Sequence, residues 1–165
     1  MATTYNLISS VTVGSGGQAN IEFTNIPDTY TDLVLKVSSR STNTNANSGY
    51  YYDVTFNNTS ANRSGIYLLR ADNAVQSASY TLWGTSSPSD FTASTFSNGE
   101  LYIPNYAGSK HKSAQLDSVN ENNSTTQRIV MSVGLWSDTA AITSIKLAQA
   151  GGNFAQYSTA YLYGI

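Results

Sequence analysis

The residues that could do chemistry are few and scattered in this chain of 165 residues. His111 is the single histidine, and it lies between Lys110 and Lys112. These cationic neighbours disfavour an imidazolium, which does not suit a general base assisted by a carboxylate. The absence of cysteine excludes disulfides, thiolate nucleophiles and cysteine-ligated metals. We therefore expect a surface histidine, no metal and no cofactor.

Two carboxylates could still cleave a glycosidic bond without help from histidine. The candidates on strand-like segments are Asp53, Glu100, Asp117 and Glu121. Their spacing does not show whether any two converge, and solvated acids on a sheet face give the same pattern. Neither a calcium-binding loop nor a glycine-rich phosphate loop is present. We predict no catalytic residue, and hence a protein that is not an enzyme.

Aromatic residues are the more informative set, with twelve Tyr, two Trp and five Phe. The candidate contact residues are Tyr51, Trp83, Phe91 and Trp136. Three interpretations stay open: an ordinary sandwich core, an interface between subunits, or a platform on which a host glycan stacks. Within the triplet 50–52, Tyr51 is predicted to face away from the other two rings, because successive strand residues alternate sides.

Charge is scarce: 11% of the residues are Asp, Glu, Lys or Arg, against about 25% in typical soluble domains. The net charge is −2 and no basic stripe is present, so we expect no nucleic-acid partner. No stretch approaches the roughly 20 apolar residues that span a bilayer, and we expect no membrane partner. The first residues also lack the features of a signal peptide, which predicts folding in the cytoplasm.

Strand signals of period two recur from end to end, separated by short polar turns. In segment 31–40, the apolar residues Leu33, Leu35 and Val37 are predicted to face inward. The charged residues Asp32, Lys36 and Arg40 are predicted to face outward. The other strands are expected at 5–13, 19–24, 50–57, 65–70, 100–103, 112–120, 127–136 and 141–148, with a weaker signal at 77–83 inside the ambiguous stretch 71–95. This pattern predicts one all-β domain over 1–165: a two-sheet antiparallel β-sandwich, jelly-roll-like, of about 8–10 strands, with a closed barrel as the competitor.

The final segment, 151–165, is a predicted half-buried strand. Tyr157, Thr159, Tyr161 and Tyr163 fall on one face, and the small or apolar residues between them fall on the other. Terminal residues are usually loose unless a sheet holds them. We therefore expect this strand to close the sandwich, without a tail or a second domain after it.

Three stretches together resemble a group of virion proteins from tailed bacteriophages. They are YNLISSVTVG at 5–14, IEFTNIPDTYTDLVL at 21–35, and the end of the chain from GNF at 152–154 to YLYGI at 161–165. The group is frequent in marine and freshwater cyanophage-like viruses, and it includes small capsid decoration (cement) proteins and modules of tail appendages. The middle of the chain, roughly 41–110, does not share the resemblance, and no catalytic residue is carried over.

The resemblance implies a non-enzymatic structural protein of the virion, assembled in the host cytoplasm. Within the group we favour a decoration protein on the capsid surface that binds the major capsid protein and stabilises its lattice. Such a protein is expected to be a homo-oligomer, a dimer or a trimer, because closed symmetry is usual. The alternative is a tail fibre or receptor-binding module that recognises a host surface glycan.

Overall fold

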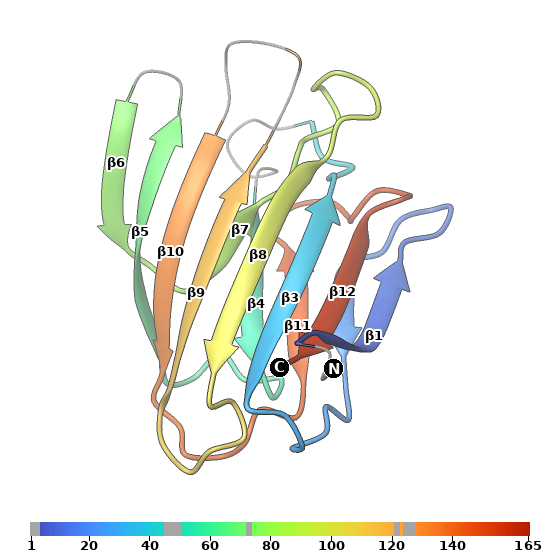
Figure 1. Ribbon diagram of the computed structural model, residues 1–165. Coiled ribbons are helices and arrows are strands. Elements are labelled where there is room, and N and C mark those ends of the chain that lie inside the picture. The colour runs from blue at the N-terminus through green and yellow to red at the C-terminus, as the bar shows by residue number, and fades with distance from the viewer. Residues whose placement is uncertain (1–3, 45–50, 72–73, 121–122, 124–127) are drawn as a thin grey trace.

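Two antiparallel sheets packed on each other form the protein (Figure 1). The computed structural model describes residues 4–44, 51–71, 74–120, 123 and 128–165, so that Tyr50 and Glu121 lie outside the described residues. The strand order is β1-β12-β3-β8-β9-β10-β5-β6 in the larger sheet and β2-β11-β4-β7 in the smaller one. The predicted all-β, two-sheet antiparallel sandwich is confirmed. Within the described ranges, no helix is long and apolar enough to cross a membrane.

The described residues contain twelve strands, more than the eight to ten expected. The larger sheet consists of β1 (Asn6–Thr12), β12 (Thr159–Gly164), β3 (Asp32–Ser39), β8 (Ser97–Pro104), β9 (Lys112–Val119), β10 (Arg128–Trp136), β5 (Arg63–Ala71) and β6 (Ala74–Ser79). The smaller sheet consists of β2 (Asn20–Phe23), β11 (Ile145–Gln149), β4 (Tyr51–Phe56) and β7 (Trp83–Thr85).

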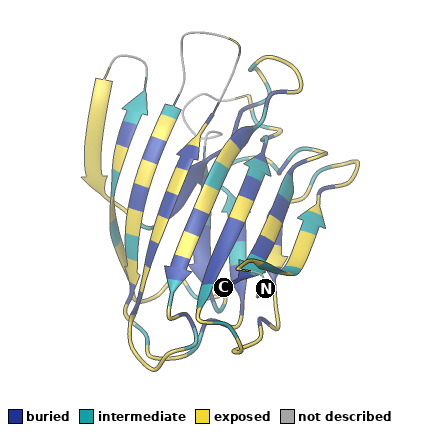
Figure 2. Ribbon diagram, viewed as in Figure 1, coloured by how far each residue is buried: buried dark blue, intermediate teal, exposed yellow. Residues whose placement is uncertain are grey.

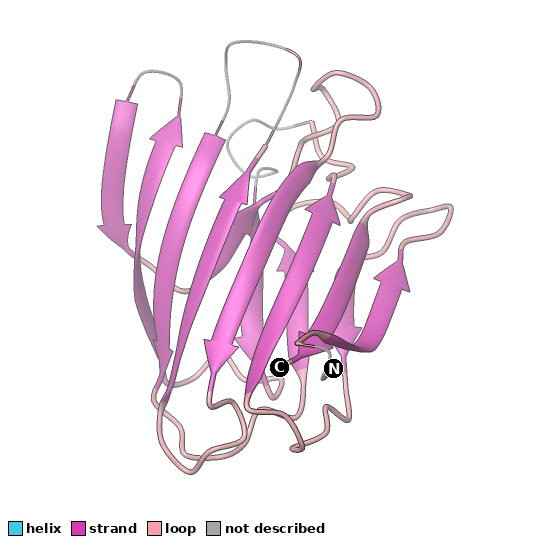
Figure 3. Ribbon diagram, viewed as in Figure 1, coloured by secondary structure: helices cyan, strands magenta, loops and turns pink. Residues whose placement is uncertain are grey.

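Alternation of buried and exposed residues explains why these segments are strands. Along β9, burial alternates at every residue, and Figure 2 shows the resulting bands on the larger sheet. In β3, Leu33, Leu35 and Val37 are buried and Lys36 is exposed, as predicted. Most of the strands (Figure 3) therefore give one face to the core and the other to solvent, which is how an antiparallel sheet covers one side of a sandwich.

Two predicted strands differ from the structure. The weak signal at 77–83 corresponds to parts of two strands in different sheets, β6 and β7. Every residue of β6 is exposed, so it has no buried face to produce an alternating pattern. In the segment 141–148, the strand begins only at Ile145; Ile142 is fully buried in a loop, where its amide donates a hydrogen bond to the Tyr106 carbonyl (2.9 Å).

The final strand, β12, lies between β1 and β3 rather than at the edge of the sheet. Ala160 and Leu162 are fully buried, whereas Tyr161 is on the exposed face, as the alternation predicts. Tyr157 precedes the strand and has a positive φ of 71°, so it does not share that face. The C-terminal strand therefore joins β1 to the rest of the sheet.

The core between the sheets is mostly apolar, and the Tyr52 hydroxyl is one of the polar groups buried in it. Tyr52 is fully buried, and its ring lies 6.1 Å from that of Phe154. The Tyr52 hydroxyl is buried and has no hydrogen-bond partner among the described residues. It lies where side chains on Gly84 and Gly99 would otherwise point. These two glycines therefore make the room that the phenol occupies.

Candidate functional site

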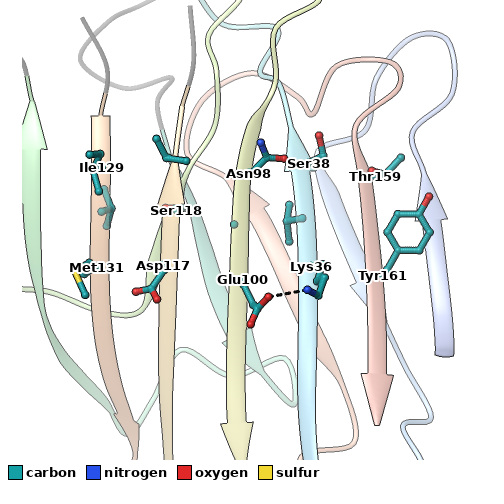
Figure 4. Close-up of a pocket in the computed structure, with 14 residues that line it drawn as sticks. Lys36, Ser38, Asn98, Glu100, Asp117, Ser118, Ile129, Met131, Thr159 and Tyr161 are labelled. Atoms are coloured by element: carbon teal, nitrogen blue, oxygen red, sulfur yellow. Dashed lines mark ion pairs between the residues drawn. The ribbon is translucent and has the colours of Figure 1, made fainter. Parts of the chain in front are cut away.

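A shallow groove of about 610 Å³ crosses the outer face of the larger sheet, over β12, β3, β8, β9 and β10 (Figure 4). The small polar side chains of Ser38, Asn98 and Thr159 line part of the groove. Lys36 and Glu100 form an ion pair within it, with Nζ 2.9 Å from Oε2. This hydrogen bond and the charge of Glu100 raise the pKa of Lys36 above its ordinary value.

The structure brings together two of the four candidate carboxylates. Glu100 and Asp117 are directly opposite each other on β8 and β9, and both line the groove. Glu100 is held by Lys36, and Asp117 accepts a hydrogen bond from Gln115 Nε2 at 3.3 Å. Asp53 lies in the other sheet, and Glu121 is outside the described residues. Among the described residues, no group of three or more His, Asp or Glu could hold a metal ion.

Beside the groove, the outer face becomes apolar over β10 and β5. Six large apolar side chains are between 40% and 57% exposed there, and we call them the apolar patch: Ile66, Leu68, Ile129, Met131, Val133 and Leu135. The strand register makes the patch continuous, because Met131 is opposite Leu68 and Val133 is opposite Ile66. No member of the patch is charged; Arg70, opposite Ile129, stands at its end.

A hollow of about 400 Å³ interrupts the apolar patch. Gly65 and Gly134 are directly opposite each other on β5 and β10, and they line the hollow with Ile66, Val133 and Leu135. Both glycines belong to the inward-facing positions of their strands, since a Cβ on Gly134 would meet the buried Leu82. The outward side chains around the hollow are the large Ile66, Val133 and Leu135 and the short Ser64. The patch therefore contains an apolar recess on its outer face.

The aromatic candidates Tyr51 and Trp83 meet in a second, smaller cleft. In β4 and β7 they occupy the face of the smaller sheet turned away from Tyr52, since Trp83 is paired with Asp53 and Gly84 with Tyr52. Val130 and Leu69 of the larger sheet nevertheless pack on Trp83. The larger sheet therefore extends past the edge strand β7 and covers its far side.

We call this space the aromatic cleft: it has a volume of about 200 Å³ and is lined by Tyr51, Tyr67, Leu69, Tyr80, Trp83 and Arg128. The ring centroids of Tyr51, Tyr67 and Tyr80 lie 5.5, 5.1 and 6.5 Å from that of Trp83, all with edge-to-face geometry. Trp83 is buried, and Tyr80 is 46% exposed at the opening. Aromatic rings thus form the inner surface of the cleft, and its opening is exposed to solvent.

Most polar groups around the aromatic cleft form hydrogen bonds or an ion pair with one another. Burial, followed by a hydrogen bond with the Tyr51 side chain, raises the pKa of Tyr80. Asp53 lies beside it and binds Arg63 Nη1 and the Thr81 hydroxyl, each at 2.9 Å. Arg63 therefore balances the charge of Asp53, and Arg128 also lines the cleft.

The other two aromatic candidates lie elsewhere. Trp136 is a core residue, 5.9 Å from the Phe56 ring, and the buried Lys112 places its Nζ 5.8 Å from the indole. That ammonium donates to the Ala140 carbonyl at 2.6 Å. Phe91 is half-buried in the loop after β7. His111 is exposed, as predicted.

Arg40 organises the loop that contains Phe91, a role that its sequence position did not indicate. Its Nη1 donates to the carbonyls of Thr92 and Thr95 at 2.9 and 2.8 Å, and its Nη2 donates to those of Ser89 and Phe91 at 3.0 and 2.9 Å. Partial burial lowers the pKa of Arg40, but a guanidinium remains charged at neutral pH. One side chain therefore caps four loop carbonyls.

Replacing Arg40 with Met is expected to cost about 3 kcal/mol of unfolding free energy, because several charge-assisted hydrogen bonds are lost together. Chemical denaturation measures this loss, and hydrogen exchange at 89–95 should accelerate locally. Lys110→Met, at an exposed position in a loop, is the control and is expected to change stability by less than about 0.5 kcal/mol. Equal losses in the two variants would contradict the role given to Arg40.

No known protein family has a model that matches this chain, and a search of curated proteins finds no match. The described residues offer two surface features that could contact another molecule: the apolar patch on the outer face of the larger sheet and the aromatic cleft beside β7.

Proposed function

We propose that this protein is a non-enzymatic structural protein of a phage virion, which docks on the major capsid protein through the apolar patch and stabilises the capsid lattice. The observation that carries the proposal is the patch itself, six large uncharged side chains on one sheet face, each at least 40% exposed. Contiguous apolar patches on soluble proteins generally mark interaction sites.

The composition of the patch suits the centre of a protein interface. Interface cores are depleted in charged residues and enriched in residues such as Met, and Met131 lies within the patch on β10, opposite Leu68. The hollow between Ile66, Val133 and Leu135 offers a pocket for one anchoring side chain, as the strongest interface contacts require. The two strands of the patch, β10 and β5, each pair with a neighbouring strand on both sides. Because their backbone is already ordered, they lose little conformational entropy when they bind a partner.

The proposal that the partner is a phage capsid rests on the resemblance of the two ends of the chain to phage virion proteins. A domain that binds only the assembled lattice shifts the assembly equilibrium by mass action, so it needs no catalytic group. Assembly as a dimer or trimer belongs to the same proposal. The edge strand β6 supports it, because its six residues are exposed, carry no charge and present an unprotected edge on which a second copy could pair.

Leu68→Lys tests the docking surface and is expected to weaken co-sedimentation with capsids at least about tenfold, because the interface would bury an unpaired ammonium. Leu7→Lys is the matched control: Leu7 is 55% exposed and Leu68 53%, but Leu7 lies on β1 near the opposite edge of the same sheet. It should bind like the wild type. A folded Leu68→Lys protein that co-sediments normally, or a wild-type protein found only at the tail tip, would contradict the proposal.

A receptor-binding module for a host glycan is the second candidate. The aromatic cleft favours it, because sugar rings stack on aromatic side chains, and Tyr51 and Trp83 are now shown to lie together.

A further inference from the structure

We propose that two copies of this protein pair through the edge strand β6, antiparallel about a two-fold axis at Ser77, and so form a dimer with one continuous sheet. The inference rests on the homo-oligomer that belongs to the proposed function. It specifies the number of copies, the strand in contact and the register, and it can be tested without capsids.

The two sheets have four edge strands, and three of them are protected against pairing. An edge strand offers free backbone donors and acceptors to another chain, and proteins protect it with bulges, charges or short length. The ladder of β1 shifts between Leu7 and Ser9, β2 has four residues and includes Glu22, and β7 has three residues, all buried. By contrast, β6 pairs with β5 without a shift, and its six residues are uncharged and exposed at the end of the larger sheet (Figure 1).

The ladder with β5 shows which backbone groups of β6 point away from the sheet. The Tyr80 amide donates to the Gly65 carbonyl at 3.0 Å, so these opposite residues are a hydrogen-bonded pair. Such pairs alternate with non-hydrogen-bonded pairs along an antiparallel ladder. The N–H and C=O groups of Val75, Ser77 and Ser79 therefore point away from β5. Among the described residues, no strand pairs with them on that side.

These three residues are self-complementary about Ser77. When Ser77 is opposite Ser77 of the second copy, Val75 of each copy is opposite Ser79 of the other, and about six backbone hydrogen bonds form. Any other register leaves at least one of the three residues without a partner in β6. No residue of β6 is charged, so no like charges face each other across the axis.

The dimer places the two apolar patches on one surface. A two-fold axis between antiparallel strands of one sheet is perpendicular to that sheet, so the outer faces of both copies point the same way. On this face, Ser77 is opposite Leu68 and Ser79 is opposite Ile66, so small side chains join the two patches. Two docking surfaces side by side raise the apparent affinity for a lattice without new contacts.

Light scattering of the whole protein after size-exclusion chromatography is the first test. We expect a dimer with a dissociation constant in the micromolar range, since a strand pair buries less area than a standard interface. Ser77→Lys should be monomeric, because two ammonium groups would face each other. Ser10→Lys, at an exposed serine on the opposite edge strand β1, is the matched control and should dimerise. A wild-type protein that is trimeric, or monomeric up to about 500 µM, would overturn the inference.

A mixture of opposite charges tests the two-fold axis. Ser77→Glu should also be monomeric by itself, whereas an equimolar mixture of Ser77→Lys and Ser77→Glu should form a heterodimer, since opposite charges then lie side by side. Both variants should melt like the wild type, because this side chain is exposed in the monomer. A mixture of folded variants that stays monomeric would contradict the axis at Ser77.

Introduced thiols report the register, because the chain has no cysteine. Ser77→Cys should give a disulfide-linked dimer with oxidised glutathione, since opposite residues of a hydrogen-bonded pair lie about 5.5 Å apart, within the range of a disulfide. Val75→Cys alone should not, because its two copies would be about 14 Å apart, but it should cross-link with Ser79→Cys. Equal cross-linking of Ser77→Cys and Ser10→Cys would overturn the register, whether or not the charged variants fold.

Failure of this inference and failure of the docking proposal give different results. Leu68→Lys should remain dimeric, since its side chain takes no part in the strand pairing, although it is expected to bind capsids weakly. Ser77→Lys should keep the apolar patch but lose the second docking surface, so its co-sedimentation should weaken. A monomeric wild type that binds capsids through the patch would overturn the dimer alone, and a dimer that does not bind capsids would overturn docking alone.

Discussion

Removal of residues 157–165 is expected to abolish folding of this protein. The deletion takes away β12, which has β1 on one side and β3 on the other, so two complete ladders are lost. It also removes Ala160 and Leu162 from the core, where both are fully buried. Loss of one buried Leu costs about 2–5 kcal/mol, and the two ladders add to it, against a total stability of about 5–15 kcal/mol for a typical domain.

The measurement is the soluble yield of the shortened chain and its thermal melting by circular dichroism. A chain that lacks residues 1–12 is the matched control, because β1 is an edge strand with β12 as its single ladder partner. We expect that control to be destabilised but still folded, since β12 would become the new edge. A soluble protein without residues 157–165 that melts cooperatively would refute the central place of β12.

The second large effect is expected for Gly99→Ala, a change of one methyl group. A Cβ at this position would lie 2.6 Å from the Tyr52 hydroxyl oxygen, and Tyr52 is fully buried and has no room to move aside. Overpacking of this kind costs about 1–3 kcal/mol. Gly14→Ala is the control, since a Cβ there has no neighbour within 4 Å; its unfolding free energy should stay within about 0.5 kcal/mol of the wild type.

Tyr52→Phe should rescue Gly99→Ala. The hydroxyl that causes the clash is removed, and the next neighbour of the new Cβ, the Ser118 Cβ, is at an ordinary 3.4 Å. The Tyr52→Phe protein itself should be as stable as the wild type or about 1 kcal/mol more stable, because the hydroxyl is buried without a partner. The double-mutant cycle should show a coupling of about 2 kcal/mol. Additive effects would contradict the packing described here.

The same phenol gives the stability a defined dependence on pH. Burial raises the pKa of Tyr52 above its usual 10.0, so above that pH the unfolded chain loses a proton that the folded protein keeps. Stability should therefore fall as the pH rises above about 10, by up to about 1.4 kcal/mol per pH unit. Tyr52→Phe should flatten this part of the curve in denaturation experiments between pH 9 and 11.

The clearest strands could be predicted because one face of each is buried and the other is exposed to solvent. The alternation around Leu33, Leu35 and Val37 and that along β12 were both confirmed. Prediction was poor for β6, which has no buried residue and therefore no such contrast. The strand β10 was predicted at 127–136, but it carries apolar residues on both faces: Val130 and Trp136 inward, Met131 and Val133 outward. A strand with two similar faces does not show from sequence which face meets solvent.

Composition and local pattern by themselves determined that this chain is an all-β sandwich with no cysteine chemistry and few charges. Alternation is a property of neighbouring residues, so it is visible along the chain. Only the tertiary structure decided which strands are neighbours, because pairing joins segments such as β12 and β3 that are far apart in sequence. That pairing put Leu68 beside Met131 in the apolar patch, placed Glu100 opposite Asp117, and brought Tyr51, Tyr67 and Trp83 into one cleft.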